Sequence, residues 1–339
     1  MKKRMIHAIF AGFGVLLLIL DSRSALSGAQ AGIELCLCSV IPSLFPFIVL
    51  TGMLAAVVSG GNFRFLHPLG KLLGIPRGSE GLFLTGILGG YPTGALAVHQ
   101  AWKCGQLRKN DAQRMLTFCS NAGPAFLFGI LGSKFPQIWM LWLLWGIHIL
   151  SAILVGMLLP GKSREQHRVT SAPSLTVTQA VKNAVSTMGY ICGWIVLIRV
   201  VLAFCDKWFL WLLPHAARVG FYGFLELANG CLTIDTLAST GARFIISSGM
   251  LAFGGICVLM QTASVTGSLG LGLYLPGKLL QTLFSILLSW LIQWLLFPAT
   301  EKIDLSLGMF LILGFTVTIL VAATRKRKIR GSIPQLFGV

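Results

Sequence analysis

Acidic residues are scarce in this sequence: 10 Asp and Glu residues occur among 339, against 27 Lys and Arg residues. Charged residues make up 11% of the chain, whereas soluble domains carry about 25%. This low charge content excludes an ordinary water-soluble domain. The hydrophobic share of 55% and the mean hydropathy of +0.81 agree with that exclusion. The composition is typical of a protein that crosses a membrane several times.

Sequence signatures of enzymes and metal sites are also missing. The chain contains no His-Glu-x-x-His, Gly-x-Ser-x-Gly or Gly-x-x-x-x-Gly-Lys-Ser/Thr string. Its one close cysteine pair, Cys36-Leu37-Cys38, has no histidine at zinc-ligand spacing. We therefore expect no enzyme, no metal site and no cofactor. Nothing resembles an ATP-binding domain, so active transport would use a coupling ion or a partner protein.

The net charge of +17 would suggest nucleic-acid binding in a soluble protein. Here the basic residues gather in a few short loops and at both ends of the chain. That distribution is typical of topology signals beside anionic lipid. The expected partners are therefore the lipid bilayer and a small-molecule solute, and no nucleic acid.

Long apolar runs fill most of the chain, and none alternates as the strands of an outer-membrane barrel do. About 20 apolar residues cross a bilayer as a helix. The basic ends, 1–4 and 325–330, place both termini in the cytoplasm, and the first run reads as a retained helix rather than a signal peptide. The predicted spans are 5–20, 33–58, 115–132, 138–159, 181–204, 245–266, 275–297 and 305–323.

Two further hydrophobic segments are interrupted, one in each half of the chain. Segment 81–101 is interrupted by Gly-Tyr-Pro-Thr-Gly at 90–94, and segment 220–238 by Glu226, Asn229 and Asp235. Basic loops flank segment 81–101 on both sides, so it should enter the membrane and return as a re-entrant hairpin. Paired interrupted segments in matching places are the best sequence pointer to the solute site of a transporter.

The charge-derived topology predicts that the second half repeats the first in opposite orientation. The predicted fold is an all-α polytopic membrane protein with an inverted-topology repeat, about eight spanning helices and two re-entrant broken hairpins. Weak residue similarity between the halves agrees, although chance likeness between apolar helices is an alternative explanation. The predicted parts are an N-terminal helix (1–30), a first repeat (31–160), a cytoplasmic linker (161–178), a second, inverted repeat (179–300) and a C-terminal helix with a basic tail (301–339).

Polar residues in apolar runs are the candidate solute-binding groups, because such groups are costly inside a membrane. Glu226 could contact a solute or hold a helix break together, and Arg199 could pair with it, attract an anion or snorkel to the interface. The short amides and hydroxyls could bind a solute or pack helices. The candidates are Gly90, Tyr91, Pro92, Thr93, Gly94, Ser120, Asn121, Arg199, Glu226, Asn229 and Gln261.

The strings at 90–95, 116–124, 223–226 and 253–255, together with Gln261, resemble the YlbJ-type sporulation integral membrane proteins. The resemblance covers roughly residues 30–300. That family is similar to proteins with the nucleoside-recognition gate domain, which belong with concentrative nucleoside transporters. The resemblance implies passage of dipicolinic acid across the outer forespore membrane. In that family the Pro-x-Gly-Ala motif is usually followed by lysine, whereas this chain has Leu96.

The expected function is therefore transport or facilitated passage of a small polar, anionic solute by a multi-pass protein of the cell membrane. The outer forespore membrane is the expected location in a spore-forming host. One alternative is a carrier of nucleosides or other metabolites. Another is a sporulation membrane scaffold that transports nothing.

Overall fold

The computed structural model describes residues 2–60, 64–159, 161 and 175–302, and all regular structure within these ranges is helical. The helices of the first half are α1 (Lys2–Leu20), α2 (Ser22–Leu35), α3 (Ile41–Gly60), α4 (His67–Leu73), α5 (Gly81–Gly89), α6 (Thr93–Lys103), α7 (Lys109–Cys119), α8 (Pro124–Leu131) and α9 (Ile138–Leu158). Those of the second half are α10 (Val177–Trp208), α11 (His215–Leu225), α12 (Leu227–Leu232), α13 (Thr240–Phe253), α14 (Gly255–Thr266) and α15 (Tyr274–Leu296).

Short turns of other helix types connect these elements. A π-helical turn, Cys36–Val40, joins α2 to α3 without ending the helix. The 3-10 turns are Arg64–Leu66, Gly132–Lys134, Leu210–Leu212, Ile234–Thr236, Gly267–Leu269 and Ala299–Glu301.

Six helical segments in the described ranges are long and apolar enough to cross a membrane, and each overlaps a predicted span. They are Ser22–Leu54, Lys109–Lys134, Ile138–Leu158, Val177–Trp208, Thr240–Leu269 and Tyr274–Leu296. Helix α1 carries a shorter apolar run, Ala11–Leu20. The span at 305–323, the basic tail and most of the linker at 161–178 lie outside the described residues. The total of eight spans therefore stays a prediction.

Large apolar side chains cover the outer faces of these helices. Leu16 on α1, Leu26 on α2, Trp142 on α9, Leu197 on α10 and Leu295 on α15 are each at least half exposed. Soluble monomeric proteins rarely expose apolar surfaces of this extent to water. Lipid chains are the solvent that matches it.

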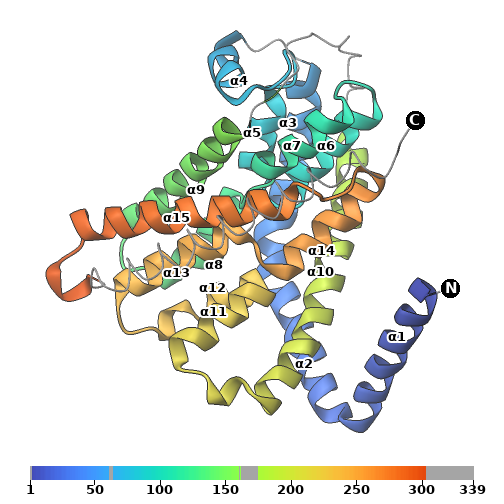
Figure 1. Ribbon diagram of the computed structural model, residues 1–339, viewed down its shortest axis with the longest axis vertical. Coiled ribbons are helices and arrows are strands. Elements are labelled where there is room, and N and C mark those ends of the chain that lie inside the picture. Colours follow the sequence, from blue (N-terminus) through green and yellow to red (C-terminus); the bar gives the residue numbers. More distant parts are fainter. Residues whose placement is uncertain (1, 61–63, 160, 162–174, 303–339) are drawn as a thin grey trace, which may run out of the picture.

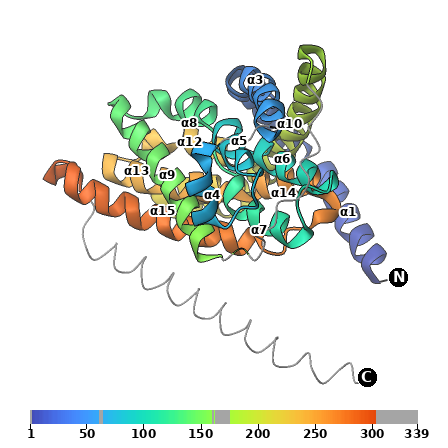
Figure 2. The same cartoon turned by 90° about the horizontal axis from the view of Figure 1, so that it is seen from above.

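Two pairs of long helices frame the molecule. Helix α2 packs along α10, and α9 packs along α15 (Figures 1 and 2). The first contact depends on Gly28 and Gly32, four residues apart, where a Cβ atom would lie 2.8 Å from the Cα atoms of Val200 and Val196 respectively. Small residues at this spacing let two membrane helices approach closely.

The packing of the short helices is matched between the halves. Helix α7 contacts α9 of its own half and α15 of the other, while α13 contacts α15 of its own half and α9 of the other. Likewise α6 contacts α14, and α12 contacts α8. In Figure 1 the pair α5–α6 lies above the α9–α15 pair, and α11–α12 lies below it.

Both predicted interruptions are helix breaks. Helix α5 ends at Gly89 and α6 begins at Thr93, while α11 ends at Leu225 and α12 begins at Leu227. The spans predicted at 115–132 and 245–266 are broken as well. The first is interrupted between α7 and α8, and α8 begins at Pro124, directly after Gly123. The second is interrupted at Gly254, with φ of +84°, a break that the analysis did not predict.

Arg114, in the basic stretch that follows segment 81–101, is buried. Its guanidinium donates to the carbonyls of Leu73 (2.7 Å), Gly74 (2.5 Å) and Leu159 (3.0 Å). These carbonyls lie at the C-terminal ends of α4 and α9, where helices leave acceptors unpaired. Arg114 therefore joins the ends of two helices and does not serve as an exposed topology charge.

Glycines allow each hairpin to press against the broken helix that follows it. Cβ atoms on Gly86 of α5 and Gly94 of α6 would collide with the backbone carbonyl of Cys119, at the end of α7. In the second half a Cβ atom on Gly223 would collide with the side chain of Met250. The first hairpin is thus held at backbone contact with the end of α7, and the second packs against the side chain of Met250 on α13.

We expect Gly86→Ala to lower the free energy of unfolding by about 2 kcal/mol, because overpacking against a fixed group typically costs 1–3 kcal/mol. Gly146→Ala on α9 is the matched control, since a Cβ atom there meets nothing within 4 Å. The control should be neutral or stabilising by up to about 1 kcal/mol, as Ala favours helix more than Gly does. Thermal unfolding in detergent tests both, and equal melting temperatures would contradict the close contact.

Candidate functional site

A small cavity lies where the breaks of the two halves meet. The first half contributes Gly90, Tyr91 and Gly123 to its wall, and the second contributes Glu226, Ala228 and Gln261. Apolar side chains complete the lining, among them Val40 and Val258. Its volume is about 30 Å³, room for roughly two water molecules. Four of the candidate residues, Gly90, Tyr91, Glu226 and Gln261, therefore meet around one small cavity.

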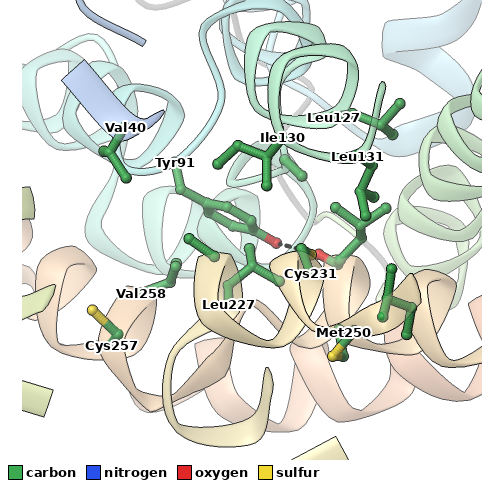
Figure 3. Close-up of a cluster of buried hydrophobic side chains, with 14 of the residues drawn as sticks. Val40, Tyr91, Leu127, Ile130, Leu131, Leu227, Cys231, Met250, Cys257 and Val258 are labelled. Carbon is green, nitrogen blue, oxygen red and sulfur yellow. Dashed lines mark hydrogen bonds between the residues drawn. The ribbon is translucent and has the colours of Figure 1, made fainter. Parts of the chain in front are cut away.

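Tyr91 reaches from the first hairpin into the second half of the molecule. Figure 3 shows its ring between Ile130 and Leu227, with the hydroxyl pointing toward the helices of the second half. The hydroxyl donates to the carbonyl of Leu251 at 3.2 Å. That carbonyl belongs to the last turn of α13, which ends at Phe253 and leaves such acceptors without a helical donor. The break in one half is thus completed by a side chain of the other.

The ammonium of Lys278 on α15 lies behind Tyr91, and only 1% of this residue is exposed. Its Nζ donates to the Tyr91 hydroxyl at 3.1 Å, to Oε1 of Gln281 at 2.7 Å and to the carbonyl of Ser120. It also lies 5.0 Å from the centre of the Tyr91 ring. In the described part of the chain no carboxylate forms an ion pair with it. All three donors therefore meet neutral acceptors, and no carboxylate among the described residues balances the charge.

The four residues between α7 and α8 form hydrogen bonds with side chains of α9 and α15. Nε2 of His148 accepts from the backbone N–H of Ala122 at 3.0 Å. Asn121 donates to the carbonyl of Phe118 at 2.7 Å and accepts from Gln281 at 3.1 Å. All these side chains are buried. Backbone groups that a break frees inside a membrane must find partners within the protein, and these side chains supply them.

The break in the second hairpin has a carboxylate at its centre. Glu226 accepts from the backbone N–H groups of Ala228 (3.0 Å) and Asn229 (2.5 Å), and so caps the N-terminus of α12. Arg199 donates to Oδ1 of Asn229 at 2.8 Å instead of pairing with Glu226. Glu226 thus performs the structural task left open by the sequence and also faces the cavity.

The other candidates have supporting positions. Pro92 precedes the first turn of α6, and Thr93 is buried with no hydrogen-bond partner for its Oγ1 in the described residues. Gly94 contacts the end of α7. Gln261 lines the cavity and donates to the sulfur of Cys257 at 3.3 Å. The Oγ of Ser120 lies 3.5 Å from the hydroxyl oxygen of Tyr274. Ser120 is beside Lys278 and not on the cavity wall.

Lys278 and Gln281 are the residues that sequence reasoning missed. Lys278 stands near the start of an apolar run, where lysines usually mark an interface. A periodic signal was nevertheless present. Buried polar residues recur along one face of α15 at helical spacing, a pattern that marks an inward face. They are Lys278, Gln281, Thr282, Ser285, Ser289 and Gln293.

No group of three or more His, Cys, Asp or Glu side chains in the described residues could hold a metal ion. All eight cysteines lie in the described part of the chain, and all are free thiols.

The chain is similar to a sporulation integral membrane protein, YlbJ of Bacillus subtilis (strain 168). The two are 26% identical over 309 aligned residues, which cover 77% of this chain and 75% of that protein. This similarity confirms the predicted resemblance. Together with the six helices of spanning length, it identifies a multi-pass integral membrane protein. No family model and no solved structure matches the chain.

We expect Glu226→Ala to lower the free energy of unfolding by about 1–2 kcal/mol, because two backbone donors at the start of α12 lose their acceptor. Glu34→Ala on α2 removes an exposed carboxylate and should change it by less than about 0.5 kcal/mol. Thermal unfolding of both variants in detergent makes the comparison. A Glu226→Ala protein as stable as Glu34→Ala would rule out the capping role.

Proposed function

We propose that this protein carries a small polar, anionic solute across a membrane. The observation that supports this most is the cavity shared by the helix breaks of both halves, with Tyr91 on one side and Glu226 and Gln261 on the other. Irregular backbone at membrane depth is tolerated where it is buried in protein or lines a cavity. Secondary transporters place their solute sites at such paired breaks. A scaffold has no need of them.

We further propose that the two halves form an inverted repeat. In each half a long helix is followed by a broken hairpin, a broken span and another long helix. Each hairpin contacts the broken span of the other half, α6 with α14 and α12 with α8. The two hairpins also lie on opposite sides of the α9–α15 pair (Figure 1). Reciprocal contacts of this kind are what an inverted repeat produces.

The conformation observed is closed in this proposal. A cavity of about 30 Å³ holds water only, whereas pockets for small organic ligands have volumes of about 300–1,000 Å³. Entry of a solute therefore requires the hairpins to move relative to the breaks. The glycine contacts at Gly86, Gly94 and Gly223 identify the surfaces that would slide.

Dipicolinate is the first solute to test, because the resemblance to sporulation membrane proteins implies it. In a spore-forming host the outer forespore membrane would be the place of transport. A nucleoside is the alternative solute, since the same resemblance extends to proteins with the nucleoside-recognition gate domain.

Proteoliposomes containing the purified protein should take up labelled dipicolinate faster than empty liposomes. Gln261→Leu should slow uptake by about two- to tenfold, because one hydrogen bond contributes roughly 0.5–1.5 kcal/mol. Asn121→Ala should also slow it, through loss of the contact to Gln281. Gln179→Leu is the matched control, because Gln179 is an exposed residue in the first turn of α10. This variant should leave uptake unchanged.

Uptake by the folded wild-type protein that equals the rate of empty liposomes would refute transport of dipicolinate. Uridine, assayed in the same vesicles, separates the two solutes. Transport of uridine without dipicolinate would select the nucleoside alternative. Transport of neither by folded protein would favour the scaffold.

A further inference from the structure

The buried ammonium of Lys278 has a role that extends the proposed transport function and rests on it. We propose that Lys278 is the cation that binds a carboxylate group of the solute, and that Tyr91 covers it in the closed state. Three features of Lys278 support this role: the charge balance around it, its neighbours and its position next to Tyr91.

The charge balance is incomplete. Lys278 is buried, its three donors meet a hydroxyl, an amide oxygen and a carbonyl, and no acidic side chain in the described residues pairs with it. Hydrogen bonds from neutral groups satisfy the geometry of an ammonium but do not cancel its charge. A buried charge without a counterion is costly, and groups of this kind inside membranes mark binding sites or ion pathways. An anionic solute would bring the missing charge.

The neighbours of Lys278 also suit a carboxylate. The nearby amide of Gln281 has a donor nitrogen, and the side chain of Tyr274, which carries a hydroxyl, lies beside the ammonium. One oxygen of a carboxylate can accept from the ammonium while the other accepts from a hydroxyl or an amide. A neutral solute would gain the hydrogen bonds but not the attraction between opposite charges.

Tyr91 separates Lys278 from the cavity. Its ring forms part of the cavity wall, while its hydroxyl accepts a hydrogen bond from Lys278 and donates one to Leu251. The hydroxyl oxygen therefore occupies the place where a solute oxygen would sit. Displacement of this side chain would join the cavity, with Glu226 and Gln261 on its wall, to the ammonium.

A purely structural role for Lys278 is the competing explanation, because it also joins α15 to the break at Ser120. The two explanations differ in what they predict for the charge of the solute. A structural lysine affects folding and every solute alike. A binding lysine discriminates between an anion and a neutral molecule of the same shape.

The test compares dipicolinate with pyridine-2,6-dicarboxamide, its neutral analogue, for binding to purified protein in detergent and for uptake into proteoliposomes. Wild-type protein should bind dipicolinate at least about tenfold more tightly than the diamide, since 1.4 kcal/mol of charge pairing corresponds to a factor of ten. Lys278→Gln should abolish this preference by weakening dipicolinate binding about tenfold while diamide binding stays the same. Lys278→Arg should keep the preference for the anion.

Lys182→Gln is the matched control. It removes one positive charge from an exposed position on α10 and should leave the preference unchanged. Folding of each variant is checked by its elution profile and melting temperature. A folded Lys278→Gln protein with the wild-type preference would overturn the assignment. So would a wild-type protein that accepts the diamide as well as dipicolinate, an outcome that needs no variant. Uptake of neither compound would overturn the proposed function as well.

Tyr91→Phe tests the covering role by itself. The variant keeps the ring but loses the hydroxyl oxygen that accepts from Lys278 and the hydrogen bond to Leu251. A carboxylate therefore no longer competes with a hydroxyl for the ammonium. We expect dipicolinate to bind about two- to tenfold more tightly to this variant, because one neutral hydrogen bond of the closed state is lost. Weaker binding of dipicolinate to folded Tyr91→Phe would show that Tyr91 holds the solute and does not exclude it.

Discussion

Backbone groups freed by the helix break at 120–123 must find partners in surroundings that offer no water. This requirement fixes much of the centre of the molecule. The carbonyl of Ser120 accepts a hydrogen bond from Lys278, and the N–H of Ala122 donates one to the ring nitrogen of His148. Each unmatched group would cost about 1–3 kcal/mol or more. Helices α9 and α15 therefore lie together beside the break because both carry the side chains that complete it.

The other breaks obey the same requirement with different chemistry. At the second hairpin the carboxylate of Glu226 supplies acceptors for two backbone donors within its own half. At Gly254 the partner comes from the opposite half, where the Tyr91 hydroxyl reaches the carbonyl of Leu251. The polar atoms that could recognise a solute are thus already used to hold the closed state. In the proposed function, a solute binds by taking over some of these hydrogen bonds.

Much of this architecture could be predicted from local sequence. Runs of apolar residues predicted the spanning helices, and Gly-Tyr-Pro-Thr-Gly and Glu226 predicted the hairpin breaks, because glycine, proline and a lone carboxylate have few other uses in an apolar run. The break at Gly254 was missed, since a glycine pair inside a membrane helix is common. Whether a Gly-Gly step packs or breaks a helix depends on what lies opposite, which here is the hydroxyl of Tyr91.

The centre of the site was harder to predict because it depends on contacts between distant segments. Lys278 and Ser120 are 158 positions apart along the chain. Sequence reasoning therefore considered Arg199, which lies inside a predicted span, as a residue that could pair with Glu226, attract an anion or snorkel, whereas the structure bonds it to Asn229. Arg114 shows the same limitation, because a basic residue near a loop looks like a topology signal until its carbonyl partners on α4 and α9 are known.

Competition for the donors of Lys278 suggests how solute binding could be linked to opening. The ammonium contacts the first hairpin through Tyr91 and the broken span through Ser120, and Tyr91 in turn contacts α13 through Leu251. A ligand shifts a conformational equilibrium only through its different affinity for the two states. A carboxylate that takes the ammonium from Tyr91 weakens the chain of bonds that joins the hairpin to the opposite half. In the proposed transport cycle, the energy gained by neutralising a buried charge would act against the contacts that keep the cavity closed, and the empty protein, which gains no such energy, would stay shut.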